Sequence, residues 1–354
     1  MTRFIQIHAL TVHAPSNLNR DDTGRPKTAK FGGAERLRIS SQALKRAIRT
    51  SEGFKTRVKA HHGQRTQRLG EEVHQYLLSK GVTPDAARNG ARAIAAIFGK
   101  IKPEGDKNPA YIEQLAFISP EERNAAFALA DKVAAGEKLP EERDDLVPEV
   151  LRKADSAIDI AMFGRMLADN PDYNREAAVQ VAHAITTHRV EIEDDFYTAV
   201  DDLKKPSEDA GAGFIGELGF GSGVFYLYAC VDRDLLERNL GGDKRLAATA
   251  IAALVEGVAT ASPSGKQASF ASRARAGYLR IEKGSQQPRS LAAAFLRPVH
   301  GDDLLAASIA AVEGEAGLAA AMNNAYGPCF DAHYVMNVAG GQGSLIEAMA
   351  VAME

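Results

Sequence analysis

Apolar residues alternate with more polar ones at the start of the chain. In residues 2–12, Ile5, Ile7 and Ala9 fall on one side of an extended backbone. Alternation with a period of two residues is typical of a β-strand with one buried face. Residues 36–39 alternate charged and aliphatic side chains in the same way, so we expect a second, shorter strand there.

The period then changes to that of a helix. Ser40 or Ser41 is suited to cap the first turn, because a serine hydroxyl accepts a hydrogen bond from a free backbone N–H group. The spacing that follows predicts a core-facing side made of Leu44, Ala47 and Ile48. The opposite face collects polar residues at i, i+3, i+4 and i+7, namely Gln42, Lys45, Arg46 and Arg49.

Helical spacing dominates from about residue 65 to residue 145. Its clearest start lies at Ser119, which is followed by Pro120 and Glu122 in the arrangement of a capping box. We interpret this region as a helical insertion that projects from the main domain, with a separate domain as the alternative.

Strand character returns after the insertion. Residues 156–166 and 177–191 are expected to be strands that pair with the N-terminal ones. Residues 196–231 begin with aromatic residues, carry six glycines between Gly211 and Gly223 and end in an alternating strand, which predicts a long β-hairpin arm. Further helices are expected at 232–239, 244–261 and 302–325, and further strands near 277–282 and 329–338. These elements together predict an α+β fold.

The composition of the 354 residues is that of a soluble globular protein, with 45% apolar residues, 25% charged residues and no apolar run of membrane-spanning length. The N-terminal residues lack the continuous apolar segment of a signal peptide. Cys230 and Cys329 have no metal-type spacing, so neither a disulfide framework nor a zinc site is indicated. We therefore expect a reducing, cytoplasmic location.

Charge is unevenly distributed along the chain. The formal net charge is −3, but residues 1–70 carry fifteen Lys or Arg against four acidic residues, a balance of +11, whereas the remainder has a balance of −14. Cations in the glycine-rich loop before the helix are Arg20, Arg25, Lys27 and Lys30. Cations beside a closely approachable backbone suit a polyanion, although a solvated surface would show the same residues. A second, weaker basic group comprises Lys266, Arg273, Arg275 and Arg280.

Other candidate chemistry is less well supported. Gly211, Gly213 and Gly216 match G-x-G-x-x-G. A dinucleotide site requires a strand before this motif and a helix after it, and the sequence pattern predicts neither here. Asp21 and Asp22 could bind magnesium and activate water for phosphodiester cleavage, or could act as turn formers or arginine partners. The residues therefore indicate no compelling catalytic site and no metal site.

Met166, Phe196 and Tyr197 carry flat or polarizable side chains. On a protruding arm, such side chains can stack on bases without reading their sequence, as in single-strand binders. The alternative is that all three belong to the core.

Several long motifs carry a resemblance to a known family: FIQIHAL, SNLNRDD, FGG, RLRISSQALKRAIR, GRM, AHAITTH, FYTAVDDL and SGVFYLYA. In this order they resemble the backbone subunits of the type I-E Cascade complex, RAMP-superfamily proteins of the CRISPR RNA-guided surveillance assembly. The resemblance covers residues 1–51 and 157–270, and it is weak in the helical insertion and in the C-terminal third.

The resemblance implies an RRM-like (ferredoxin-like) palm with a helical finger insertion and a β-hairpin thumb. In this chain, the palm would comprise residues 1–64 and 146–354, the fingers residues 65–145, and the thumb hairpin residues 193–223.

The resemblance also implies a ribonucleoprotein subunit in antiviral defence, which polymerises as a helical filament along CRISPR RNA (crRNA) and displays guide segments for pairing with target DNA. The residues implied to hold the guide backbone are Arg20, Lys27, Ser40, Gln42, Lys45, Arg46 and Arg49, with Lys266 as a further contact. Those implied to wedge at a displaced nucleotide are Met166, Tyr197 and Val200. The family usually shows a Trp-Phe pair at the thumb base, where this chain has Phe196-Tyr197.

The implied partners are crRNA, the target DNA strand, further copies of the chain and the other Cascade subunits. These are the 5′-handle-capping subunit, the crRNA-processing endonuclease, the small subunit and the large subunit; no membrane and no cofactor are expected. The family implies a non-catalytic subunit. A magnesium-dependent ribonuclease that uses Asp21 or Asp22, as in related type III backbone subunits, is the alternative, and a nucleotide enzyme that uses the glycine run is a third hypothesis.

Overall fold

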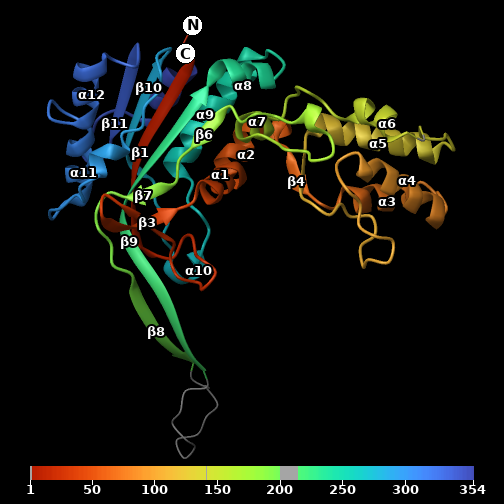
Figure 1. The fold of residues 1–354 in the computed structure, drawn as a ribbon, viewed down its shortest axis with the longest axis horizontal. Coiled ribbons are helices and arrows are strands. Elements are labelled where there is room, and N and C mark those ends of the chain that lie inside the picture. Colours follow the sequence, from red (N-terminus) through yellow and green to blue (C-terminus); the bar gives the residue numbers. More distant parts are fainter. Residues whose placement is uncertain (1, 141, 200–213) are drawn as a thin grey trace, which may run out of the picture. The chain divides into compact units, whose positions relative to one another are not determined.

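The computed structural model describes residues 2–140, 142–199 and 214–354. Contacts between residues divide the chain into two compact units (Figure 1). The sheet unit comprises residues up to 54, 181–230 and 252–354, and the helical unit comprises residues 55–180 and 231–251.

The sheet unit is built on a sheet with the strand order β11-β10-β1-β9-β7-β3-β2, and β8 pairs with β9 beyond this path. The pairs β1–β10, β10–β11, β2–β3, β3–β7, β7–β9 and β8–β9 are antiparallel. The strands are β1 (Phe4–Ser16), β2 (Thr28–Phe31), β3 (Ala34–Ile39), β7 (Ala184–Thr186), β8 (Glu193–Ala199), β9 (Phe214–Asp232), β10 (Ala276–Gly284) and β11 (Ala332–Asn337).

Strand β1 is buried on both of its faces. Ile5 and Ile7 are fully buried, as the alternation predicts, but the polar Gln6 and His8 are buried as well. The Nδ1 atom of His8 lies 2.8 Å from the hydroxyl of Tyr226, and burial lowers the pKa of His8, so the imidazole is neutral near pH 7. The strand is therefore confirmed, and its second face is packed rather than solvated.

Helices cover the sheet and fill the connections of this unit. They are α1 (Ser41–Thr50), α9 (Lys244–Thr260), α10 (Gln267–Phe270), η3 (Ala292–Phe295), α11 (Leu304–Val312), α12 (Leu318–Tyr326) and α13 (Leu345–Met353), with α9 beginning in the helical unit. One core cluster joins Tyr226 and Tyr278 of the sheet to Phe295 and Val312 of η3 and α11. In Figure 1 these C-terminal helices, α11 and α12, lie beside β10 and β11.

The helical unit has its own core, formed between α3, α4, α5 and α6. Its elements are η1 (Lys59–His61), β4 (Gln64–Thr66), α3 (Leu69–Ser79), α4 (Pro84–Ala96), β5 (Ala116–Ile118), α5 (Pro120–Ala134), α6 (Arg143–Val150), α7 (Ile158–Phe163), η2 (Pro171–Tyr173) and α8 (Arg233–Asn239). Helix α2 (Glu52–Val58) and strand β6 (Val179–Val181) cross the sequence boundaries between the units. Of the described helices, none is long and apolar enough to cross a membrane.

The capping box at Ser119 is confirmed. Its Oγ accepts a hydrogen bond from the N–H of Glu122 at 3.1 Å, and the Glu122 carboxylate accepts one from the N–H of Ser119 at 3.1 Å. The helical unit contains the predicted insertion 65–145 and adds residues 55–64 before it and residues 146–180 and 231–251 after it. The later residues include α7 and α8, which contact each other.

Three predicted elements were wrong in type or extent. The strand expected at 156–166 is wrong, because the centre of this segment forms the helix α7 (Ile158–Phe163). Residues 158–162 are all buried, so no polar face marks a helical period in the sequence. The segment 177–191 contains two short strands, β6 and β7, in place of one. The helix expected at 302–325 is divided into α11 and α12, since Gly314 has a φ of +81°.

His13 allows a test of the sheet-unit core. It is 4% exposed, its ring packs edge-on against Phe225, and its Nδ1 atom has no hydrogen-bond partner among the described residues. Burial lowers the pKa of His13 to about 4.

In the unfolded chain, the pKa of His13 has the ordinary histidine value of about 6.5. The sheet unit should therefore lose stability as pH falls from about 6.5 towards 4, by on the order of 3 kcal/mol for this residue. We expect His13→Leu to reduce the difference in the free energy of unfolding between about pH 7 and pH 5, measured with urea, and to leave the part due to His8. An unchanged difference would contradict this account.

Candidate nucleic-acid interface

Residues 17–27 form a loop that is fastened to the sheet unit at several points. The side-chain Nδ2 of the buried Asn17 donates to the carbonyl oxygens of Gly24 and Gly219, both at 2.9 Å. The side-chain oxygen of Asn19 accepts a hydrogen bond from the N–H of Ser40 at 2.9 Å. The basic loop is thus tied to the arm strand β9 and to the start of helix α1.

Asp21 is a turn former. Its Oδ1 accepts hydrogen bonds from the N–H and the hydroxyl of Thr23, at 2.9 and 2.8 Å, and from the N–H of Arg25 at 3.0 Å. The hydroxyl of Thr23 is the main cause that lowers the pKa of the Asp21 carboxyl. Asp22 is exposed. Within the described ranges, no three His, Cys, Asp or Glu side chains lie together as a possible metal site.

Helix α1 forms as predicted, and it presents its polar face outwards. Ser40 is the N-cap, with its Oγ accepting from the N–H of Ala43 at 3.3 Å, while Leu44 and Ile48 are buried. Gln42 and Arg46 are exposed, and Lys45 and Arg49 are half-buried. Partial burial lowers the pKa of the Lys45 ammonium. Among the described residues, neither Lys45 nor Arg46 has a side-chain partner.

The loop between α9 and β10 brings Lys266 to the basic loop. Gly265 packs directly against the backbone of Leu18, where a Cβ atom would overlap the carbonyl oxygen. This close approach places Lys266, which has a φ of +50°, beside the loop that carries Arg20. The two backbones lie so close that only a glycine fits at this position.

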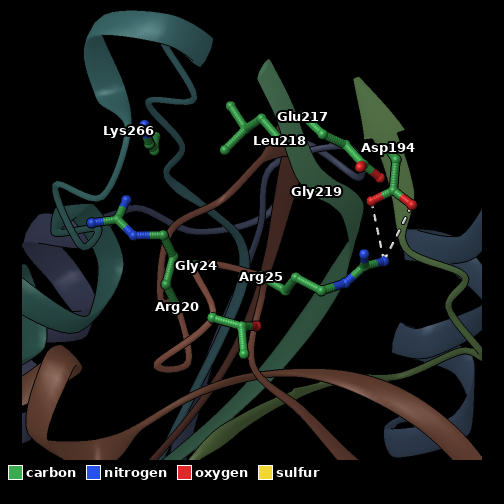
Figure 2. Close-up of a pocket in the computed structure, with 9 residues that line it drawn as sticks. Arg20, Gly24, Arg25, Asp194, Glu217, Leu218, Gly219 and Lys266 are labelled. Atoms are coloured by element: carbon green, nitrogen blue, oxygen red, sulfur yellow. Dashed lines mark hydrogen bonds and ion pairs between the residues drawn. The ribbon is translucent and has the colours of Figure 1, made fainter. Parts of the chain in front are cut away.

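A hollow of about 440 Å³ lies between these segments. Figure 2 shows Arg20 and Lys266 on one side of it and the carboxylates of Asp194 and Glu217 on the other. Arg25 reaches across to Asp194, with a nitrogen–oxygen distance of 3.1 Å. Arg25 is therefore neutralised, whereas Arg20 and Lys266 have no side-chain partner in the described part of the chain.

Lys27 belongs to a second group of cations, where the start of β2 lies beside β3 and the N–H of Arg38 donates to the Lys27 carbonyl oxygen at 2.8 Å. Arg38 lies 3.0 Å from Nδ1 of His183, and burial together with the charges of Arg38 and Lys27 lowers the pKa of His183. The imidazole is therefore neutral near pH 7, and the surface beside Lys27 has a positive potential.

The predicted arm is confirmed as the hairpin of β8 and β9, which projects from the sheet unit (Figure 1). Phe196 and Tyr197 are 66% and 47% exposed, so they are not core residues. Being consecutive in a strand, they lie on opposite faces, and the Tyr197 ring covers Gly216. Val200 lies outside the described residues.

Met166 belongs to the helical unit, where it is 79% exposed. The core alternative is therefore excluded for this residue also. The other described candidates for the guide backbone and the wedge all belong to the sheet unit.

The glycine run does not form a dinucleotide site at its described end. Gly216 lies inside strand β9 and is followed by further strand residues, so no helix opens there. Gly211 and Gly213 lie outside the described residues.

The second basic group is divided by the structure. Arg280 is buried, and its guanidinium binds Glu282 at 2.6 Å and Glu313 at 2.7 Å. It is therefore a structural residue, which the structure separates from the other members of the second basic group. Arg273 and Arg275, in contrast, are exposed.

The sequence pattern did not predict two contacts of the basic surface. The pairing of Arg25 with Asp194 and that of Arg38 with His183 each join residues from distant segments. The acidic run 191–195 beside the aromatic pair was the only local signal for the first contact.

A loop held by several hydrogen bonds, a polar helix face and cations without described partners are together typical of a polyanion-binding surface. The chain belongs to the CT1975-like protein family, whose model matches residues 5–353. No curated protein matches the chain.

Similar chains occur in many solved structures, and two of these are surveillance complexes. One is a chain of a "CRISPR RNA-guided surveillance complex, pre-nicking", with 35% identity, a TM-score of 0.75 and coverage of 85% of this chain and 83% of that chain. The other is a chain of a "CRISPR RNA-guided surveillance complex", with 26% identity, a TM-score of 0.71 and coverage of 99% of this chain and 100% of that chain.

The contact of Gly265 with Leu18 can be tested by substitution. Gly265→Ala should force the two segments apart and destabilise the sheet unit by about 1–3 kcal/mol, because the added Cβ meets backbone that cannot rotate away. We expect a lower melting temperature and faster proteolysis within residues 260–273. Gly105→Ala is the control, since no atom lies within 4 Å of its added Cβ. Equal stability of the two variants would disprove the role of Gly265.

Proposed function

We propose that this chain is the non-catalytic backbone subunit of the type I-E Cascade complex, which polymerises along crRNA and holds its phosphate backbone. The observation that carries the proposal is the group of cations without described partners on one unit: Arg20, Lys45, Arg46 and Lys266. Unpaired cations on a preformed surface favour an anionic ligand, because no internal ion pair has to be broken on binding. The two similar chains come from RNA-guided surveillance complexes.

The chemistry of the surface fits contacts to phosphate rather than to base edges. Lysine and arginine side chains that bind phosphates position a nucleic acid without reading its sequence. Sequence specificity is then left to Watson–Crick pairing between the guide and the target DNA strand. Phe196 and Tyr197 add exposed rings on which bases can stack.

The proposal assigns a role to each part of the chain. In the proposal, residues 1–64 and 146–354 form the RRM-like palm, residues 65–145 of the helical unit are the fingers, and residues 193–223, which include β8, are the thumb. Met166, Tyr197 and Val200 wedge at a displaced nucleotide, and further copies of the chain and the other Cascade subunits are the protein partners. The proposal also includes a cytoplasmic location of the complex.

Removal of phosphate contacts tests the proposal directly. Lys45→Ala combined with Arg46→Ala should weaken binding of single-stranded RNA to the same degree for sequences of different composition. Each lost contact should reduce the slope of log affinity against log salt by about 0.7. A gel-shift titration with CRISPR-length RNA at several salt concentrations measures both quantities, and the wild-type chain should bind cooperatively.

Arg238→Ala is the matched control, because this exposed arginine belongs to α8 of the other unit. It should leave the affinity and the salt dependence unchanged. Unchanged values in the double variant as well would refute the proposal.

The non-catalytic role has its own test. Because Oδ1 of Asp21 is already occupied by the turn, we expect RNA incubated with the chain and magnesium to remain intact. Denaturing electrophoresis checks this result. Shortened RNA that depends on magnesium and disappears in Asp22→Ala would establish the ribonuclease alternative instead.

A further inference from the structure

A second hollow lies on the other side of the loop that carries Lys266. Its volume is about 480 Å³, within the range of small-ligand sites. Its polar lining comes from α1, from the start of α2, from the end of α9 and from the segment between α9 and β10, and it includes Arg46, Thr50, Glu52, Ser262, Ser264 and Arg273. All of these residues belong to the sheet unit.

Two arginines face this hollow from different elements. Arg46 lies on α1, and Arg273 lies just before β10. Both are exposed, and neither guanidinium has a hydrogen-bond or ionic partner in the described ranges. Two arginine side chains beside hydroxyl groups form a donor set that matches the oxygen atoms of a phosphate group.

The segment that carries Arg273 is held in place by its own hydrogen bonds. The side-chain amide of Gln267 donates to the carbonyl oxygens of Pro263 at 3.3 Å and Ser272 at 2.9 Å. The buried Ser272 lies next to Arg273, and its hydroxyl donates to the carbonyl oxygen of Ala14 in β1 at 3.4 Å. The backbone of Arg273 is therefore anchored to the sheet, and only its side chain has to be ordered by a ligand.

The two hollows share a wall. Ser264 and Gly265 line the second hollow, and the next residue, Lys266, lines the first. Gly265 also seats this wall on Leu18, which lines the second hollow. A strand that lies across the wall would meet Arg20 and Lys266 on one side and Arg46 and Arg273 on the other.

We infer that Arg273 and Arg46 together bind a backbone phosphodiester group of the RNA strand, in a subsite separate from that of Arg20 and Lys266. This inference rests on the proposed function and extends it to a residue, Arg273, with no role assigned so far. Glu52 is the one acidic residue in the described part of the chain that lines the hollow, and it allows a second test in which removal of a charge strengthens binding. Glu52 is exposed beside the two arginines and repels a phosphate group, so it lowers the affinity of the subsite.

The experiment compares charge variants of the full chain with a single-stranded RNA of mixed sequence at several salt concentrations. Arg273→Ala should weaken binding several-fold and reduce the salt slope by about 0.7. Glu52→Gln should tighten binding. Arg273→Lys should restore the salt slope but not the full affinity, because an ammonium group keeps the charge and loses the planar fork.

Arg238→Ala and Arg20→Ala serve as references, and melting temperatures confirm that each variant is folded. If Arg20→Ala weakens binding while Arg273→Ala and Glu52→Gln behave like Arg238→Ala, the second subsite is disproved and the proposed function stands. If Arg20→Ala and the Lys45→Ala, Arg46→Ala double variant also bind like wild type, the proposed function fails, and the inference fails with it.

Discussion

The two hydrogen bonds donated by the Asn17 side chain fix the position of the basic loop, residues 17–27, on the sheet unit. Asn17 is fully buried, and its amide joins the carbonyls of Gly24 and Gly219, so it fastens the basic loop to the strand that continues into the arm. Gly265 then seats the Lys266 segment on the same loop. Cations on a fastened scaffold lose less conformational entropy when they bind a ligand, which favours a preformed site over an adaptable one.

Two groups of arginines in the described part of the chain differ in burial and in partners. Arg165 and Arg175 are buried in the helical unit and paired with Glu122 and Asp155, so removal of either partner would leave an uncompensated charge in the core. Arg46, in contrast, is exposed and has no described partner. Loss of one partner of a buried ion pair destabilises the fold. An unpaired surface cation can be removed, or can bind a ligand, at little cost to stability.

One long strand connects the core to the arm. The inner part of β9 pairs with β7 at Tyr226, and its outer part pairs with β8 as far as Phe214. The aromatic pair of the arm is therefore carried by a strand whose other end is anchored in the sheet. Gly216 leaves room for the Tyr197 ring on one face of the hairpin, and Phe196 occupies the opposite face. The base-stacking role that we propose for these rings rests on their exposure and not on a pocket.

The sequence by itself determined the elements that depend on near neighbours. Strand β1, the helix α1 with its Ser40 cap and the capping box at Ser119 are all set by residues a few positions apart. It did not determine α7, because a segment that is buried on all sides has no polar face to set a period.

The tertiary structure alone decided which cations are available. Arg273 and Arg280 look alike in the sequence, but Glu282 and Glu313 bind only the second, and this difference depends on strand pairing and burial. The approach of Lys266 to Arg20 likewise depends on a glycine packed against a distant backbone. Contacts between distant segments leave no periodic pattern in the sequence. The presence of many cations could therefore be predicted, but their partners and positions could not.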